Sequence, residues 1–490
     1  MDYQPIFYAL LPDLIVVVTL FAALGVDYGY MRGASLKERA ARTLQICSLG
    51  LLGGLVMLVL QLEGTLPLDY AELLVATHGQ LMLSPGTLAL KWLLFALGMA
   101  VLPLAARHMV TVHVSEYFAL LLLATLGMGF MVASRNLLGA FVALELVSLS
   151  LYSLTALHQT RRTSAEAALK YLTYGGVSTA FLLFGLSYFY GMTGALDLSA
   201  VSEAVPSSPL ITVAYLFILV GIGFKIAVAP FHLWAPDVYQ AAPTPAAAWI
   251  ASGSKIAGVG LLLSLLKPVA GQPPIVLLLA AMAVLSMSVG NLGALRQSNL
   301  KRLLAYSAIA NAGYLLVGVV AFSAAGNTSV IFYILVYSLA SLGAFGVVAV
   351  LTDTLGRDAE ISDFNGCWKT TPGLAAAFLV FVLSLAGIPP LAGFLGKFYL
   401  FFAAIGAAPE AASWHDGFYW LVAFALIMSV VSLYYYLRVL KAFLVAPADD
   451  GAAIAPSKIG WAAGVTLCVL ALAVVALGLW PEPLLGLLRN

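Results

Sequence analysis

The sequence has few charged residues and few cysteines. Only 9% of its 490 residues are Asp, Glu, Lys or Arg, and no basic patch stands outside short loops, so nucleic-acid binding is not expected. Cys47, Cys367 and Cys468 lie far apart and form no CxxC pair, which argues against an iron–sulfur cluster or a structural zinc site. Neither a GxGxxG turn after a strand nor a GxxxxGK[ST] loop occurs. The chain therefore carries no known motif for binding NADH or ATP.

Apolar residues make up 62% of the chain. A membrane-spanning helix needs about 20 predominantly apolar residues. Hydropathy predicts an all-α polytopic membrane protein with about 14 spans, near residues 5–25, 43–62, 87–107, 114–133, 136–157, 165–190, 209–230, 245–267, 274–292, 301–323, 329–352, 372–404, 416–444 and 460–480. Asp2 stands where a signal peptide would have a basic segment, so we expect the first span to be retained.

Lys and Arg residues are unevenly distributed between the two predicted sides. The loops and helix ends on one side carry fifteen of the 23, and the other side carries only Arg135, Lys267 and Arg489. Cytoplasmic loops carry the excess of positive charge. The bias predicts that both termini lie in the periplasm if the chain resides in a bacterial inner membrane.

Five lysines remain inside predicted spans, and two of them have simple explanations. Lys91 lies near the outer end of its span, where it can extend to the headgroups. Lys170 follows Glu166 by four residues near an inner helix end and can form an i,i+4 ion pair. Glu166 and Lys170 remain secondary candidates for a proton path, together with His232 and Tyr306.

Lys225, Lys255 and Lys397 are harder to explain, as is Glu145 in the fifth span. A lysine in the middle of a bilayer costs about 2.5–3.5 kcal/mol on insertion scales, so it indicates a functional site. The structural alternative is a set of buried ion pairs that hold helices together, but three lysines and one glutamate do not balance. If Glu145 faces Lys225, the pair forms a proton site whose affinity depends on their separation.

Two of these lysines accompany helix-breaking prolines. Lys225 precedes Pro230, and Lys397 follows Pro389-Pro390. Inverted repeats with discontinuous helices are a transporter architecture. We therefore predict broken helices 7 and 12 and four parts of the chain: a three-helix segment at 1–107, one five-helix repeat at 114–267, an inverted one at 274–444, and a last helix within 460–490.

Three motifs carry a family resemblance: FHLWAPDVYQAAPTP from Phe231 to Pro245, SKIAG around Lys255, and GIPPLAGFLGKFYLF from Gly387 to Phe401. They resemble the antiporter-like membrane subunits of respiratory complex I, the bacterial NADH-quinone oxidoreductase. The resemblance covers nearly the whole chain. Gln240-Ala241-Ala242 and Ala246–Trp249 depart from the usual family residues without touching the lysines.

The resemblance implies a role for each matching residue. Glu145 and Lys225 match the family's charge pair, Lys255 matches its central relay, and Lys397 stands where one sister subunit has glutamate. It also implies that this chain translocates protons, with FMN, iron–sulfur clusters and quinone held in partner subunits and none in this chain. Expected partners are the other membrane-arm subunits and the lipid bilayer. Two alternatives stay open, a subunit of a multi-subunit cation/proton antiporter and an inert scaffold.

Overall fold

The computed structural model describes residues 4–65, 73, 77, 80–158, 161–198, 209–353, 355, 357–407, 418–447 and 459–489. Within these ranges the regular secondary structure is helical apart from three isolated bridges, and 13 helices are long and apolar enough to cross a membrane. The twelfth predicted span consists of two shorter apolar helices, α17 (Pro372–Ala386) and α18 (Ala392–Gly406). The predicted all-α membrane fold is confirmed. Lys458, one of the fifteen basic residues above, lies outside the described ranges.

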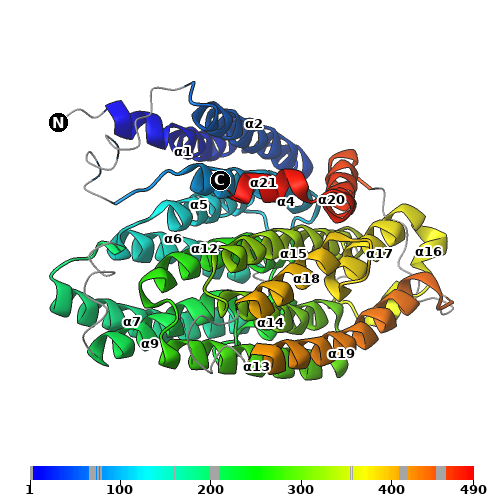
Figure 1. The fold of residues 1–490 in the computed structure, drawn as a ribbon. Helices are drawn as coiled ribbons and strands as arrows, with labels where there is room; N and C mark the ends of the chain where they lie inside the picture. The colour runs from blue at the N-terminus through cyan, green and yellow to red at the C-terminus, as the bar shows by residue number, and fades with distance from the viewer. Residues whose placement is uncertain are drawn as a thin grey trace. The chain divides into compact units, whose positions relative to one another are not determined.

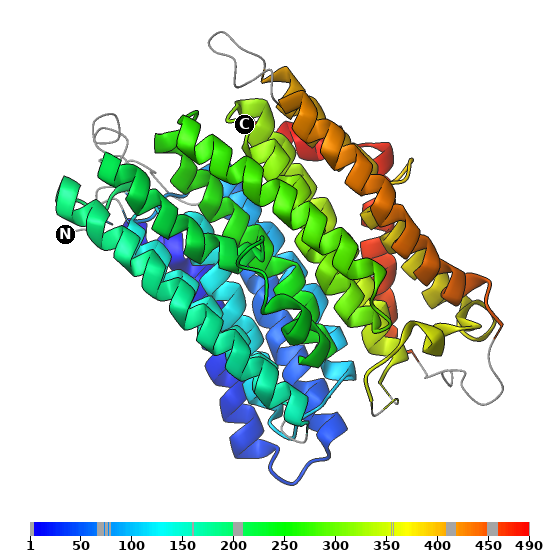
Figure 2. The same ribbon diagram turned by 90° about the horizontal axis from the view of Figure 1, so that it is seen from below.

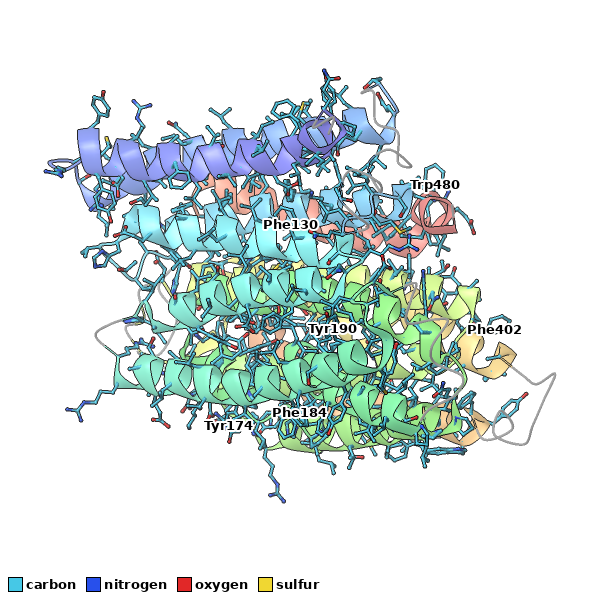
Figure 3. The ribbon with its side chains drawn as sticks, turned by 90° about the vertical axis from the view of Figure 1, so that its left-hand side faces the viewer. Phe130, Tyr174, Phe184, Tyr190, Phe402 and Trp480 are labelled. Atoms are coloured by element: carbon cyan, nitrogen blue, oxygen red, sulfur yellow. The ribbon has the colours of Figure 1, made fainter. Side chains whose placement is uncertain are left out.

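The chain divides into two compact units. The first comprises residues up to Gly221 together with Gly260–Pro268. Its helices are α1 (Gln4–Tyr30), α2 (Leu36–Leu62), α4 (Pro85–Arg107), α5 (Val114–Ala133), α6 (Leu137–Ala156), α7 (Arg162–Thr193) and most of α9 (Pro209–Ile226). Helices adjacent in sequence pack side by side, and α5 also contacts α1 and α2. Large apolar side chains are exposed along α7, including Tyr174, Phe184 and Tyr190 (Figure 3), as expected of a face that meets lipid or a partner subunit.

The second unit comprises Ile222–Val259 and Val269–Arg489. Its helices are the end of α9, α10 (Ala235–Ala241), α11 (Thr244–Ala251), the start of α12 (Gly253–Leu266), α13 (Pro273–Leu295), α14 (Leu300–Val319), α15 (Ala324–Leu351), α16 (Cys367–Thr370), α17, α18, α19 (Phe418–Leu444), α20 (Trp461–Leu479) and α21 (Glu482–Arg489). The spans α14 and α15 are the most deeply buried. They pack against each other and against α18, while α19 packs along α13 (Figures 1 and 2).

Polar residues cap several helices. Ser35 and Glu38 form a capping box at the start of α2, and Ser84 and Thr87 form one at the start of α4. Asn299 accepts a hydrogen bond from the N–H of Arg302 at the start of α14. Such caps satisfy N–H groups that the first turn of a helix leaves without partners.

Candidate functional site

The seventh and twelfth spans break at Ala227 and Gly387, which follow α9 and α17. Both residues have positive φ, 58° and 83°. In the first break the N–H of Ala227 donates to the carbonyl of Phe224 and the next N–H donates to the carbonyl of Gly223, both at 3.0 Å. In the second break the N–H of Gly387 donates to the carbonyl of Ser384 at 3.0 Å, and the next N–H donates to the carbonyl of Leu383 at 3.1 Å. This is the Schellman motif that ends many helices. The predicted breaks are therefore confirmed, and both have the same backbone turn.

Ala227 adopts the left-handed conformation without being glycine. That conformation costs a residue with a Cβ about 1–2 kcal/mol. The chain beyond it is held by side chains: Ser286 Oγ accepts the N–H of Ala229 at 2.8 Å, and the indole of Trp234 donates to the carbonyl of Phe224 at 3.1 Å. These contacts fix the break and the helix end that carries Lys225.

Lys225 lies in the last turn of α9 and is 2% exposed. Its aliphatic stem lies beside α12, with its Cγ 3.6 Å from the position of a Cβ built on Gly258. Gly258 is one helical turn beyond Lys255. The structure therefore places the stem of Lys225 along the same stretch of α12 that carries Lys255.

Lys255 follows a third interruption, which the sequence reasoning did not foresee. The predicted span 245–267 is divided at Ser252 into α11 and α12, although no proline stands there. Lys255 is 2% exposed; its Nζ donates to the carbonyl of Ala308 at 2.6 Å and lies 5.3 Å from the ring centre of Tyr337. A carbonyl and an aromatic face both favour the ammonium.

A small cavity adjoins Lys255. It is lined by Lys255, Asn311, Tyr333 and Tyr337, together with apolar residues, and leaves about 10 Å³ for the centre of a water-sized sphere. That volume is at the lower limit for one water, and the cavity wall exposes apolar atoms only, so the cavity marks loose packing beside Lys255.

Lys397 reaches back from α18 to the end of α17. Its Nζ donates to the carbonyls of Leu385 and Ala386 at 3.2 and 3.1 Å and to Ser429 Oγ at 3.4 Å. It also lies 4.8 Å from the ring centre of Tyr314. The carboxyl end of a half-helix carries partial negative charge, which stabilises a cation there. Lys255 and Lys397 both contact α14, at Ala308 and Tyr314.

Glu145 and the secondary candidates have different surroundings. Glu145 is half-buried in α6 and accepts a hydrogen bond from Thr179 of α7 at 2.8 Å. Glu166 and Lys170 form the expected i,i+4 ion pair at 2.7 Å, with side chains 64% and 40% exposed in this chain. His232 is buried within the first break, and Tyr306 packs over Gly293.

The prediction for Lys91 was wrong. It does not extend to the headgroups; its side chain is 2% exposed and forms an ion pair with Asp13 of α1. Position along a span does not reveal which way a side chain points, and here it points toward α1. The carboxylate in the first span was the available signal.

Sequence reasoning also missed six buried polar side chains around Lys255 and Lys397. They are Asn291, Asn311, Tyr314, Tyr333, Tyr435 and Tyr436. The two asparagines inside apolar helices were detectable, because an amide in a membrane span needs hydrogen-bond partners. Among the described residues, no group of His, Cys, Asp or Glu is arranged to hold a metal ion.

Buried lysines at interrupted helices, in a fold made of membrane spans, define a class of protein: a membrane subunit that moves cations or protons across the bilayer. The model of the family described as NADH:quinone oxidoreductase/Mrp antiporter, TM, matches residues 134–432. The chain belongs to this family.

Known relatives are similar over the full length. An NADH-quinone oxidoreductase subunit N 2 from Acidobacterium capsulatum is 43% identical, covering 100% of this chain and 99% of that protein. A chain of respiratory complex I from Thermus thermophilus, solved with bound aureothin, is 33% identical with a TM-score of 0.79, covering 97% of this chain and 99% of the other. A chain of the Mrp complex from Dietzia sp. DQ12-45-1b has a TM-score of 0.80 at 22% identity and covers 100% of this chain and 97% of the other, a likeness of fold.

Proposed function

We propose that this chain is the proton-translocating subunit N of the membrane arm of a bacterial NADH-quinone oxidoreductase. The observation that carries the proposal is the set of three lysines, 2%, 2% and 5% exposed, at or beside helix interruptions. Burial disfavours the charged form of a lysine, and carbonyls or aromatic rings offset that cost at Lys255 and Lys397. Small movements at the breaks therefore change how readily each lysine holds a proton.

The roles follow the order of the residues through the fold. Glu145 and Lys225 form a charge pair whose opening and closing sets proton binding at Lys225. Lys255 is the central relay, and Lys397 passes the proton toward the periplasm. Protons enter from the cytoplasm, and a charge shift in the neighbouring subunit drives the Glu145–Lys225 pair.

The architecture of the proposal comprises two inverted repeats, 114–267 and 274–444, flanked by the segments 1–107 and 460–490. The identical turns at Ala227 and Gly387 support the repeats. The bias of Lys and Arg supports periplasmic termini in the inner membrane. An alkaline phosphatase fusion at the C-terminus tests the orientation: it should be active, because that enzyme matures only in the periplasm, and an inactive fusion contradicts it.

Redox chemistry belongs to partner subunits in this proposal. FMN, iron–sulfur clusters and quinone bind there, and this chain contributes a proton path only. Lysine at position 397, where a sister subunit has glutamate, favours subunit N among the related antiporter-like subunits.

Affinity purification of the tagged chain from gently solubilised membranes tests the assignment. Flavin and iron–sulfur subunits should co-elute with it and oxidise NADH. The rival is a subunit of a multi-subunit cation/proton antiporter, which shares the fold. Purification without flavin, combined with sodium-dependent proton flux in vesicles that lack any NADH dehydrogenase, would establish that rival instead.

A further inference from the structure

Six buried side chains of the second unit form two hydrogen-bonded groups between Lys255 and Lys397. They come from four helices, α13, α14, α15 and α19 (Figure 1). Each is at most 3% exposed: Asn291, Asn311, Tyr314, Tyr333, Tyr435 and Tyr436. Ser307 of α14, 2% exposed, joins them.

Asn311 organises the group near Lys255. Its Nδ2 donates to the carbonyl of Ser307 at 2.9 Å, which fixes the orientation of the amide. Its Oδ1 then accepts the hydroxyl of Tyr333 at 2.6 Å, and its Nδ2 also donates to Ser307 Oγ at 3.2 Å. The hydroxyls of Ser307 and Tyr436 are 2.5 Å apart. Tyr333, Asn311, Ser307 and Tyr436 thus form one continuous chain.

Asn291 organises the group near Lys397 in the same way. Its Nδ2 donates to the carbonyl of Met287 at 2.8 Å, so the amide orientation is again fixed. Its Oδ1 accepts the hydroxyl of Tyr435 at 3.1 Å, and its Nδ2 donates to the hydroxyl of Tyr314 at 3.0 Å. Both asparagines therefore accept from one tyrosine and donate to another hydroxyl.

The ends of the two groups lie beside the lysines and beside each other. Tyr333 and Asn311 line the cavity beside Lys255. Tyr314 presents its ring to Lys397 Nζ at 4.8 Å. Tyr435 and Tyr436 are neighbours on α19, with ring centres 4.5 Å apart. The side chains thus extend from one lysine to the other.

We propose that these hydroxyl groups carry protons between Lys255 and Lys397, and that Asn311 and Asn291 are positioning residues that hold the hydroxyls in one donor direction. The proposal rests on the proposed function and deepens it, because it assigns the segment of the path between the second and third lysines.

Proton balance assigns different roles to the two residue types. A hydroxyl can accept a proton on its oxygen while releasing its own, so it is neutral before and after the transfer. An amide that did so would be left as its imidic acid tautomer. A proton therefore passes beside each asparagine, by rotation of a hydroxyl that the asparagine positions.

The competing explanation is that the network only holds helices together, as polar side chains in membranes often do. Replacing Tyr333 with phenylalanine tests this, because Tyr333→Phe removes the hydroxyl and keeps the ring. Tyr117 provides the matched control: it is 0% exposed, and its hydroxyl has no hydrogen-bond partner in the described part of the chain.

The experiment uses the intact complex in proteoliposomes and measures protons taken up per NADH oxidised, with assembly checked on native gels. Positioned proton-transfer groups contribute about 100-fold or more to a transfer rate, so Tyr333→Phe should lose the protons carried by this chain. Once assembly is confirmed, a purely structural role leaves the number of protons per NADH unchanged. Tyr117→Phe should match the parent.

The outcomes separate the two levels of the proposal. If Tyr333→Phe and Tyr435→Phe pump like the parent while Lys255→Met does not, the tyrosine path is wrong and the proposed function stands. If Lys255→Met also pumps normally, the proposed function itself fails. If Tyr333→Phe does not assemble, Tyr435→Phe decides by the same criteria, since it removes one hydroxyl from the other group.

Discussion

The ion pair between Lys91 and Asp13 leads to a prediction about stability. The two side chains are 2% and 4% exposed, and Lys91 Nζ also lies 5.5 Å from the ring centre of Phe130 (labelled in Figure 3). Asp13 Oδ1 has no hydrogen-bond partner among the described residues, so the ammonium is the main compensation for burying this carboxylate. Removing one partner of such a pair costs about 3–5 kcal/mol.

Lys91→Met keeps most of the apolar stem and removes the charge. We expect it to destabilise the subunit by about that amount, whereas the double variant Asp13→Leu/Lys91→Met should recover most of the loss, because apolar replacement of a whole buried pair is often neutral. The assay heats the purified complex and follows the fraction of this chain that stays assembled. Lys369→Met, at an exposed position, is the control for losing a lysine. If the single and double variants melt together with the parent, the pair does not stabilise the fold.

Two further predictions concern the breaks and the charge pair. Gly387→Ala should destabilise its break by about 1–2 kcal/mol because of the positive φ, and it should lower pumping because the added Cβ would lie 3.0 Å from Lys397 Cδ. Ala227→Gly relieves the same backbone conformation and should be tolerated. Equal melting temperatures for the two variants would contradict this argument. Under the proposed pairing of Glu145 with Lys225, Glu145→Gln should shift the pH profile of proton pumping, because the charge beside the lysine is lost. A profile that superimposes on the parent's means that Glu145 and Lys225 do not interact.

The sequence contained most of what determines the fold. Each span needs a long apolar run, so hydropathy located the spans, and Pro230 and Pro389-Pro390 marked the two broken ones because proline interrupts helical hydrogen bonding. The break at Ser252 escaped prediction because no proline marks it, although Ser252-Gly253-Ser254 is a Gly/Ser pair at which helices often kink. It depends on neighbouring helices, including α15, from which Ser338 donates to the carbonyl of Ser252 at 3.4 Å.

The site was only partly predictable for a related reason. Lys225, Lys255 and Lys397 stood out because a charge inside an apolar run is rare. The burial of Lys91 depended on which face of α4 it occupies, and the partners of Tyr333 and Tyr435 come from helices distant in sequence. Those relations arise only when the helices pack, so no local pattern contained them.

The most direct test of the account is proton uptake by proteoliposomes that contain the complex with Lys255→Met, measured per NADH oxidised and compared with Lys369→Met. Lys255 is buried against the carbonyl of Ala308, at the centre of the proposed path, whereas Lys369 is exposed. The account predicts fewer protons per NADH for Lys255→Met and the parent value for Lys369→Met, with both complexes assembled. Equal proton yields from the two variants would contradict the claim that buried lysines carry the proton.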